Sequence, residues 1–119
     1  TATTTSIQSN ASTAYDLSLL AHYAYSKTFI RQTVIKKEAE IASVDGATTH
    51  KLTTTNDLLN SYLKVLGLKT GTTDEAGECL IAIIENDQGH DILTVVLNSP
   101  DRYTETKILA DWTFRAYQW

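Results

Sequence analysis

The sequence predicts an α+β fold in which helices pack on an antiparallel β-sheet. Two continuous apolar segments, residues 80–84 and 92–97, enclose the turn sequence Asn86-Asp87-Gln88-Gly89 and indicate a β-hairpin. Segments near both ends of the chain instead repeat apolar residues at the spacing of an α-helix. A length of 119 residues fits one domain, and 42% hydrophobic and 20% charged residues are ordinary globular values.

A first helix is expected to start at Ser12 or Thr13 and to end near Ser26. Thr13 followed by Asp16 is a capping-box pattern, in which side chains bind the free backbone N–H groups of the first turn. The preceding residues, 1–11, are expected to form a flexible tail, and residues 8–11 resemble the remnant of a cleavable tag. Helical spacing predicts a buried face made of Leu17, Leu20, Ala21 and Ala24.

The middle of the chain predicts a hairpin followed by a strand. Asp45-Gly46 tolerates the positive φ of a tight turn, so residues 33–43 and 48–55 are expected to pair across it. Residues 56–59 are expected to form a short helical turn or a loop, and residues 65–73 fit a strand.

The last third predicts a second hairpin and a final helix. Residues 79–85 and 91–98 are apolar almost throughout, so both faces of their sheet should be covered. Asp101 is expected to cap a helix whose buried stripe contains Ile108, Leu109, Trp112 and Ala116. Two helices are too few to cover both faces of such a sheet fully. Either the chain dimerises, or a missing segment of a longer parent chain supplies the second layer, which is the interpretation we favour.

Charge and composition exclude several classes of protein. A net charge of −4 argues against a nucleic-acid partner, because phosphate binding needs clustered Lys and Arg side chains. No segment reaches the roughly 20 apolar residues of a membrane-spanning helix, and none resembles a signal peptide. Since the sequence contains no methionine, we expect a processed or excised part of a longer chain.

Neither cysteine nor histidine forms a recognisable site. Cys79 is the only cysteine, so no internal disulfide is expected, and its apolar neighbours predict a small buried side chain. His22, His50 and His90 share no ligand spacing, so the sequence supports neither a zinc site nor a Ser-His-Asp triad. We therefore expect no metal and no cofactor.

The most informative segment is residues 67–77, which contains Lys69-Thr70-Gly71 on a predicted strand. Lys-Thr-Gly on a strand is one of three signatures of the penicillin-recognising serine acyltransferases. A three-residue motif of this kind often occurs by chance in unrelated sequences. Here they are followed in order by a turn, a hairpin of apolar strands, Arg102 and a helix with Trp112 and Phe114, and this ordered set is much more specific.

Residues 12–119 resemble the C-terminal part of a serine D-alanyl-D-alanine carboxypeptidase, of the low-molecular-mass penicillin-binding protein family. The resemblance rests on the Lys69–Gly71 motif and on segments 12–17, 56–59, 102–106 and 112–117. It implies a partial penicillin-binding-protein/β-lactamase-like domain. It also implies an extracytoplasmic parent enzyme that trims the terminal D-alanine from peptidoglycan stem peptides through an acyl-enzyme, and whose serine reacts with β-lactams.

The resemblance also implies roles for five residues. Lys69 and Thr72 are expected to act in catalysis, because the ammonium raises the local positive potential and the Thr72 N–H would form half of an oxyanion hole. Thr70, Gly71 and Arg102 are expected to bind substrate. The Thr70 hydroxyl and the guanidinium suit a terminal carboxylate, and Gly71 leaves room for a close approach to the backbone.

Each role has a simpler alternative. The motif could be a solvated lysine, an ordinary strand threonine and a turn glycine, and Arg102 could pair with Asp101 or Glu105. Two other functions also remain. The parent could be a class A β-lactamase-like enzyme, or the chain could be a non-catalytic binding or assembly module on the same sheet.

The nucleophile expected of this family is not apparent in the chain. No Ser-x-Asn occurs, and the one Ser-x-x-Lys, Ser61 to Lys64, begins only eight residues before Lys69. We expect this match to be coincidental and the isolated chain to be inactive. Its expected partners are the missing N-terminal part of the same domain, the stem peptide in the complete parent, and further copies of itself.

Overall fold

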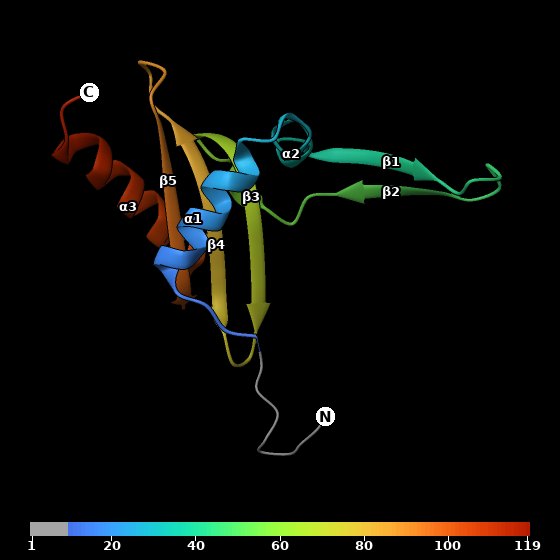
Figure 1. The fold of residues 1–119 in the computed structure, drawn as a ribbon, viewed down its shortest axis with the longest axis horizontal. Helices are drawn as coiled ribbons and strands as arrows, with labels where there is room; N and C mark the ends of the chain where they lie inside the picture. Colours follow the sequence, from blue (N-terminus) through green and yellow to red (C-terminus); the bar gives the residue numbers. More distant parts are fainter. Residues whose placement is uncertain (1–9) are drawn as a thin grey trace.

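The computed structural model describes residues 10–119, in which two helices and a hairpin precede a three-stranded sheet and a final helix (Figure 1). The predicted tail, residues 1–11, lies outside the described residues except for its last two. The elements are α1 (Ala14–Tyr25), α2 (Thr28–Val34), β1 (Glu38–Ala42), β2 (Thr49–Thr53), the 3-10 helix η1 (Asp57–Asn60), β3 (Lys64–Thr73), β4 (Gly77–Glu85), β5 (Asp91–Ser99) and α3 (Arg102–Ala116).

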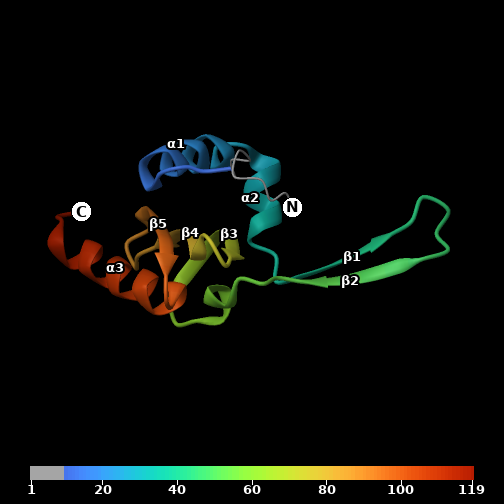
Figure 2. The same ribbon diagram turned by 90° about the horizontal axis from the view of Figure 1, so that it is seen from below.

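The main sheet is antiparallel with the strand order β3-β4-β5, so β3 is an edge strand. Figure 2 shows α1 on one face of this sheet and α3 on the other. The α+β class predicted from the sequence is therefore confirmed. The prediction that both faces of the apolar strands need cover also agrees with this arrangement, because the side chains of Ile83 and Ile84, neighbours that point to opposite faces, are both buried.

The core lies on the face of the sheet that α3 covers, and η1 contributes Leu58 and Leu59 to it. Alternate residues of β4 point into it, as the period of a strand requires. Small side chains of α3 allow the helix to approach the sheet closely, while larger aromatic ones pack at the border. The buried members are Leu58, Leu59, Val65, Leu80, Ala82, Ile84, Ile92 and Ala110, with Leu63, Tyr103 and Phe114 packed against them.

Both predicted helix caps are present. The Thr13 hydroxyl accepts a hydrogen bond from the Asp16 backbone N–H at 3.1 Å, and the Asp101 carboxylate accepts one from the Thr104 N–H at 3.2 Å. Each cap satisfies one of the N–H groups that a first turn leaves free. The first helix therefore starts and ends close to the predicted residues.

The predicted buried faces of these helices are partly wrong. In α1 Ala21 is buried as expected, but Leu20 is 62% exposed. In α3 the side chains of Ile108 and Trp112 are exposed, and the buried residues are Thr106 and Ala110. The correct face of α3 also has helical spacing, since residues 103, 106, 110 and 114 are three or four apart. Close packing on the sheet selects the smaller residues over the large apolar ones.

A helix that the sequence analysis missed precedes the first hairpin. Residues 28–34 form α2, although strand was predicted from residue 33. The β-branched residues in this region favoured strand, but a tertiary contact overrides that preference. Val34 fills the space beside Gly67 of β3, where an added Cβ would lie 2.6 Å from Val34 Cγ2. Residues 10–119 therefore contain three α-helices rather than two.

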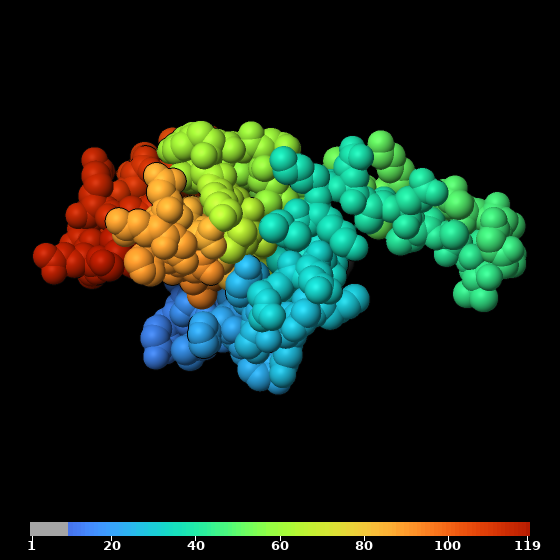
Figure 3. Space-filling model, turned by 90° about the horizontal axis from the view of Figure 1, so that it is seen from above, coloured from blue at the N-terminus to red at the C-terminus, as the bar shows by residue number. Residues whose placement is uncertain are grey.

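The hairpin of β1 and β2 projects from the rest of the molecule as a narrow arm (Figures 1 and 3). Its turn contains Asp45-Gly46 as predicted, with Gly46 at a φ of 73°. Ile41 pairs with His50 in the register, and nearly all side chains of the arm are exposed. Nothing in the arm is buried well enough to stabilise it as a sheet of its own.

Candidate functional site

The Lys69-Thr70-Gly71 motif lies in β3, whose outer edge has no neighbouring strand within the described residues. Thr70 pairs with Leu80 of β4 and is only 8% exposed, while Lys69, Gly71 and Thr72 are exposed. The motif thus combines one buried hydroxyl with an accessible ammonium and backbone. Apart from Gly71 and the residues on either side of it, no described residue has an atom within 4 Å of the position that a Cβ on Gly71 would take.

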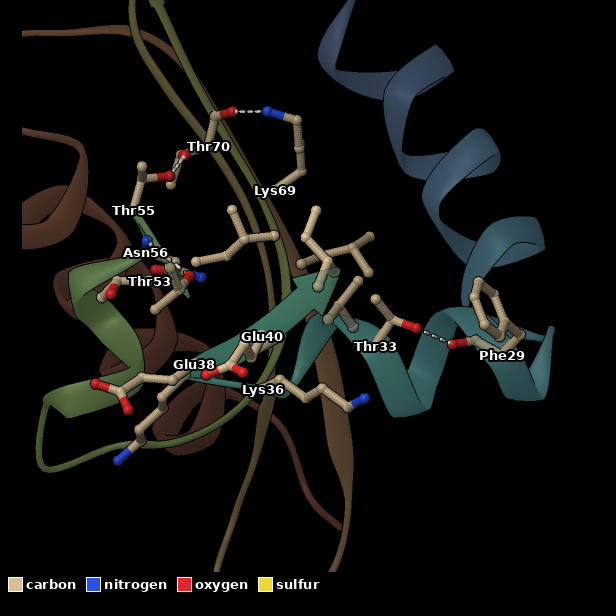
Figure 4. Close-up of a pocket in the computed structure, with 17 residues that line it drawn as sticks. Phe29, Thr33, Lys36, Glu38, Glu40, Thr53, Thr55, Asn56, Lys69 and Thr70 are labelled. Carbon is tan, nitrogen blue, oxygen red and sulfur yellow. Dashed lines mark hydrogen bonds between the residues drawn. The ribbon is translucent and has the colours of Figure 1, made fainter. Parts of the chain in front are cut away.

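The Thr70 hydroxyl is hydrogen-bonded to a second threonine hydroxyl. Thr55, which follows β2, places its Oγ1 2.8 Å from Thr70 Oγ1, and either oxygen can be the donor (Figure 4). The Lys69 Nζ donates to the carbonyl oxygen of Thr70 on the same strand (Figure 4). The three polar groups therefore lie together at one point of the β3 edge.

Lys69 and Thr70 line an open groove between β3, α2 and the base of the projecting hairpin (Figure 4). Its volume is about 570 Å³. Apolar side chains form much of its wall, and charged ones lie where the hairpin begins. The apolar members are Phe29, Val34, Ala39, Ile41, Leu52 and Leu68, and the charged ones are Lys36, Lys37, Glu38 and Glu40.

Arg102, at the first position of α3, binds two consecutive residues of β3. Its Nη1 donates to the Gly71 carbonyl at 3.2 Å and to the Thr72 hydroxyl at 2.6 Å. Its Nε lies 3.6 Å from Glu78 Oε2, which makes an ion pair without a hydrogen bond. The alternative of an ion pair with Asp101 or Glu105 is therefore wrong for the described residues.

Tyr103, the next residue of α3, holds the segment that carries Thr55. Its hydroxyl donates to the Thr55 carbonyl at 2.8 Å and accepts from the Asp57 N–H at 3.3 Å. Asn56 between them is buried, and its Oδ1 caps η1 by accepting from Leu58 N. The first turn of α3 therefore fixes both β3 and the loop that faces it.

Sequence reasoning did not identify Thr55 and Tyr103 as members of this site. Neither belongs to a motif, and no periodicity distinguishes them. The available signals were indirect, because Thr55 precedes the segment that begins at Asn56, and Tyr103 lies in segment 102–106, where only Arg102 was assigned a role. Their partners are 15 and 48 residues away in the chain.

The Ser61-x-x-Lys64 pattern does not form a pair of interacting side chains. Ser61 Oγ donates to the Leu58 carbonyl at 2.7 Å and accepts from Leu63 N at 3.3 Å. Lys64 Nζ is paired with the Glu85 carboxylate instead, and this hydrogen bond raises the pKa of the Lys64 ammonium. These contacts agree with the interpretation that the pattern is coincidental.

Cys79 is half-buried rather than buried as predicted, because it lies near the turn between β3 and β4, where cover is incomplete. Its Sγ lies 3.6 Å from the Ala76 carbonyl oxygen. Between residues 10 and 119, no three His, Cys, Asp or Glu side chains are grouped to hold a metal ion. None of the helices in that part of the chain has the length and apolar character needed to cross a membrane.

Comparison with known proteins links this arrangement to one family. The sequence model of the D-alanyl-D-alanine carboxypeptidase family matches residues 1–101. The cefotaxime-bound penicillin-binding protein D2 of Listeria monocytogenes is 36% identical, with a TM-score of 0.70, over 87% of this chain and 41% of that protein. A mutant of a Streptomyces DD-transpeptidase is 27% identical, with a TM-score of 0.83, over 92% of this chain and 44% of that protein.

A D-alanyl-D-alanine carboxypeptidase of Mycobacterium tuberculosis shares the fold at 23% identity and a TM-score of 0.77. The match covers 90% of this chain and 41% of that protein. This chain therefore spans less than half the length of each of these three structures.

Proposed function

Since the chain belongs to the D-alanyl-D-alanine carboxypeptidase family, we propose that it is part of a serine enzyme that removes the terminal D-alanine of peptidoglycan stem peptides. One observation carries this proposal. Lys69, Thr70 and Gly71 lie together on a free sheet edge, and Arg102 binds the carbonyl of Gly71 and the hydroxyl of Thr72. An anionic, extended peptide end fits such an edge.

Two side chains at this edge suit the carboxylate of the terminal D-alanine. The Thr70 hydroxyl can donate a hydrogen bond, and the Lys69 ammonium adds positive potential beside it. Arg102 still has free N–H donors among the described residues, because only its Nη1 and Nε make these contacts and a guanidinium has five donors. Bonds between ionised partners are stronger than neutral ones, so this group would fix the peptide terminus.

The backbone N–H of Thr72 is proposed as half of the oxyanion hole. Backbone groups of successive residues in a strand point to opposite edges. The Gly71 carbonyl binds Arg102, which also faces Glu78 of β4, whereas the Thr70 carbonyl accepts from Lys69. We infer that Gly71 faces β4 and that Thr72 N–H faces the free edge. A donor there could stabilise the charge that develops on the carbonyl oxygen during acyl transfer.

The free edge of β3 can also pair with an extended substrate. An edge strand leaves a row of unpaired N–H and C=O groups, which an added peptide strand can bind. Gly71 presents no side chain at this edge, and its Cβ position is open. Substrate backbone could therefore approach closely at the residue before the proposed oxyanion donor.

We propose that the nucleophilic serine comes from a part of the protein that this chain does not contain. Ser61 and Lys64 bind other partners, and the chain has no Ser-x-Asn. In the complete protein, β-lactams would acylate that serine, an expectation supported by the cefotaxime-bound relative. Family membership also supports an extracytoplasmic location for the complete protein.

The proposal is tested by measuring covalent labelling with a β-lactam. The isolated chain should show no mass increase after incubation with benzylpenicillin, because it lacks the nucleophile. The complete protein should gain one adduct outside residues 1–119 and should release D-alanine from a peptide ending in D-alanyl-D-alanine. A stoichiometric adduct on Ser61 would disprove the missing nucleophile, and a complete protein with neither activity would disprove the proposed function.

A further inference from the structure

We infer that Thr55 is a positioning residue for Thr70, with Tyr103 holding Thr55 in place. In this arrangement the Thr55 hydroxyl donates to Thr70 Oγ1, and the Thr70 proton is directed to the substrate carboxylate. The inference rests on the proposed function and adds to it two residues, from the loop after β2 and from α3, that no sequence motif contains.

The number of protons on the two hydroxyl groups decides which of them donates. Each threonine hydroxyl has one proton to donate and two lone pairs to accept with. The oxygens of Thr55 and Thr70 are 2.8 Å apart, so one of the two protons lies between them. An ionised carboxylate can only accept. When Thr70 donates to a substrate carboxylate, the shared proton must therefore come from Thr55.

This hydrogen bond also limits the orientation of the Thr70 hydroxyl. A β-branched side chain has few favourable χ1 values, and Thr70 is buried in the sheet edge. With one lone pair of Thr70 taken by the Thr55 proton, the Thr70 O–H is directed away from Thr55. A chain of two hydroxyl groups also polarises the outer donor, which strengthens its bond to an anion.

The position of Thr55 depends on Tyr103. The Thr55 side chain is exposed and lies in a loop, where a free threonine would sample several orientations. The Tyr103 hydroxyl binds the Thr55 carbonyl at 2.8 Å and the Asp57 N–H at 3.3 Å, which fixes the backbone on both sides of Asn56. Since Arg102 holds Gly71 and Thr72, the first turn of α3 sets the distance between the two threonines.

The test uses the complete protein and two probes, benzylpenicillin and its methyl ester, which differ only in the free carboxylate. Thr55→Val keeps the shape of the side chain and removes the donor. The acylation rate with benzylpenicillin should fall about three- to tenfold, as expected for one neutral hydrogen bond, and the rate with the ester should stay unchanged. Thr55→Ser should restore the wild-type rate. Equal losses with both probes, or no loss, would disprove the inference.

Two comparisons make the result specific. Thr53→Val is the matched control, since Thr53 lines the same groove and its side chain makes no hydrogen bond within residues 10–119, and it should leave both rates unchanged. In a Thr70→Val background, Thr55→Val should have no further effect, because the two hydroxyl groups act in series. Additive losses in the double variant would contradict the arrangement.

Failure of the inference can be separated from failure of the proposed function. If Thr70→Val lowers the benzylpenicillin rate and Thr55→Val does not, only the positioning role is wrong. If Thr70→Val has no effect either, the carboxylate site itself is wrong, and the inference falls with it. Tyr103→Phe should give a smaller loss than Thr55→Val with the same dependence on the carboxylate, because it loosens the loop without removing the donor.

Discussion

At the scale of single residues, the side chain of Arg102 makes several contacts that stabilise the site. Its Nη1 bridges the Gly71 carbonyl and the Thr72 hydroxyl, and its side chain is only 16% exposed. The guanidinium also lies over the ring of Tyr103, 5.0 Å from the ring centre. The flat fork of arginine allows these contacts simultaneously, which a lysine ammonium could not reproduce.

A substitution at Thr70 should separate binding from folding in the complete protein. Thr70→Val keeps the β-branched shape and removes the donor proposed for the carboxylate. A hydrogen bond to a charged group contributes about 1.5–3 kcal/mol, so kcat/KM on a D-alanyl-D-alanine peptide should fall roughly ten- to over a hundredfold. Lys69→Ala should lower kcat/KM at least as much, because it also removes the positive potential of the ammonium.

The control for this experiment is again Thr53→Val, which should keep wild-type kcat/KM. Thr73→Val is less suitable, because the Thr73 hydroxyl accepts from Ala76 N at 3.0 Å and supports the β3–β4 turn. Wild-type kcat/KM in both the Thr70 and the Lys69 variants would reduce the motif to an ordinary strand end.

The two glycines of β3 should respond differently to alanine. Gly67 has a φ of 147° and packs against Val34, so Gly67→Ala should destabilise the chain by about 1–3 kcal/mol from backbone strain alone. Gly71 has open space around it, so Gly71→Ala should leave the melting temperature nearly unchanged while lowering acylation in the complete protein. Thermal unfolding of both variants is the measurement, and equal melting temperatures would contradict this account.

At the scale of elements, α3 connects the core to the site. Its middle packs against the sheet through Thr106 and Ala110, and its first turn carries Arg102 and Tyr103. The Asp101 cap fixes where that turn begins. The Thr104 hydroxyl and N–H donate to its carboxylate, and these hydrogen bonds lower the pKa of Asp101.

The lowered pKa of Asp101 makes the cap dependent on pH. A group whose folded-state pKa is below its unfolded value, about 3.9 for aspartate, stabilises the fold above that value. This contribution is lost as the pH falls through the folded pKa. Asp101→Asn should therefore lower the melting temperature at about pH 6, and the difference should shrink towards zero near about pH 2. A difference that stays constant with pH would show that the charge contributes nothing.

At the scale of the whole molecule, large apolar side chains remain on the surface although both sheet faces carry a helix. They lie on the outer sides of α1 and α3 and at the start of α2. Exposed apolar groups of this extent are unusual for a soluble monomer. The residues are Tyr15, Leu19, Leu20, Tyr23, Phe29, Ile108 and Trp112.

The isolated chain should therefore self-associate. In sedimentation velocity, the average sedimentation coefficient should rise with protein concentration, because association removes these side chains from water. Leu20→Gln should weaken the association, and His22→Gln, on the same helix and also exposed, should not. A compact monomer at all concentrations, without binding of an apolar dye, would be evidence against exposed association surfaces.

The sequence alone determined the features whose causes lie within a few neighbouring residues. The caps at Thr13 and Asp101 could be predicted because a capping side chain binds the N–H of a residue three positions later. The apolar strands and the turn at Asp45-Gly46 could also be predicted, because each depends on the residues within its own short segment. The motif at residues 69–71 was also visible, while its proposed chemistry remains a prediction.

Only the tertiary structure decided which surfaces meet. Helix α2 and the buried face of α3 depend on contacts with distant strands, at Gly67 and around Ala110, and local preference pointed elsewhere. Thr55 and Tyr103 joined the site for the same reason, since a hydrogen bond across 15 or 48 residues leaves no pattern in the intervening sequence. Interactions between residues close in sequence can be predicted from the sequence, whereas the packing of distant segments depends on the fold of the whole chain.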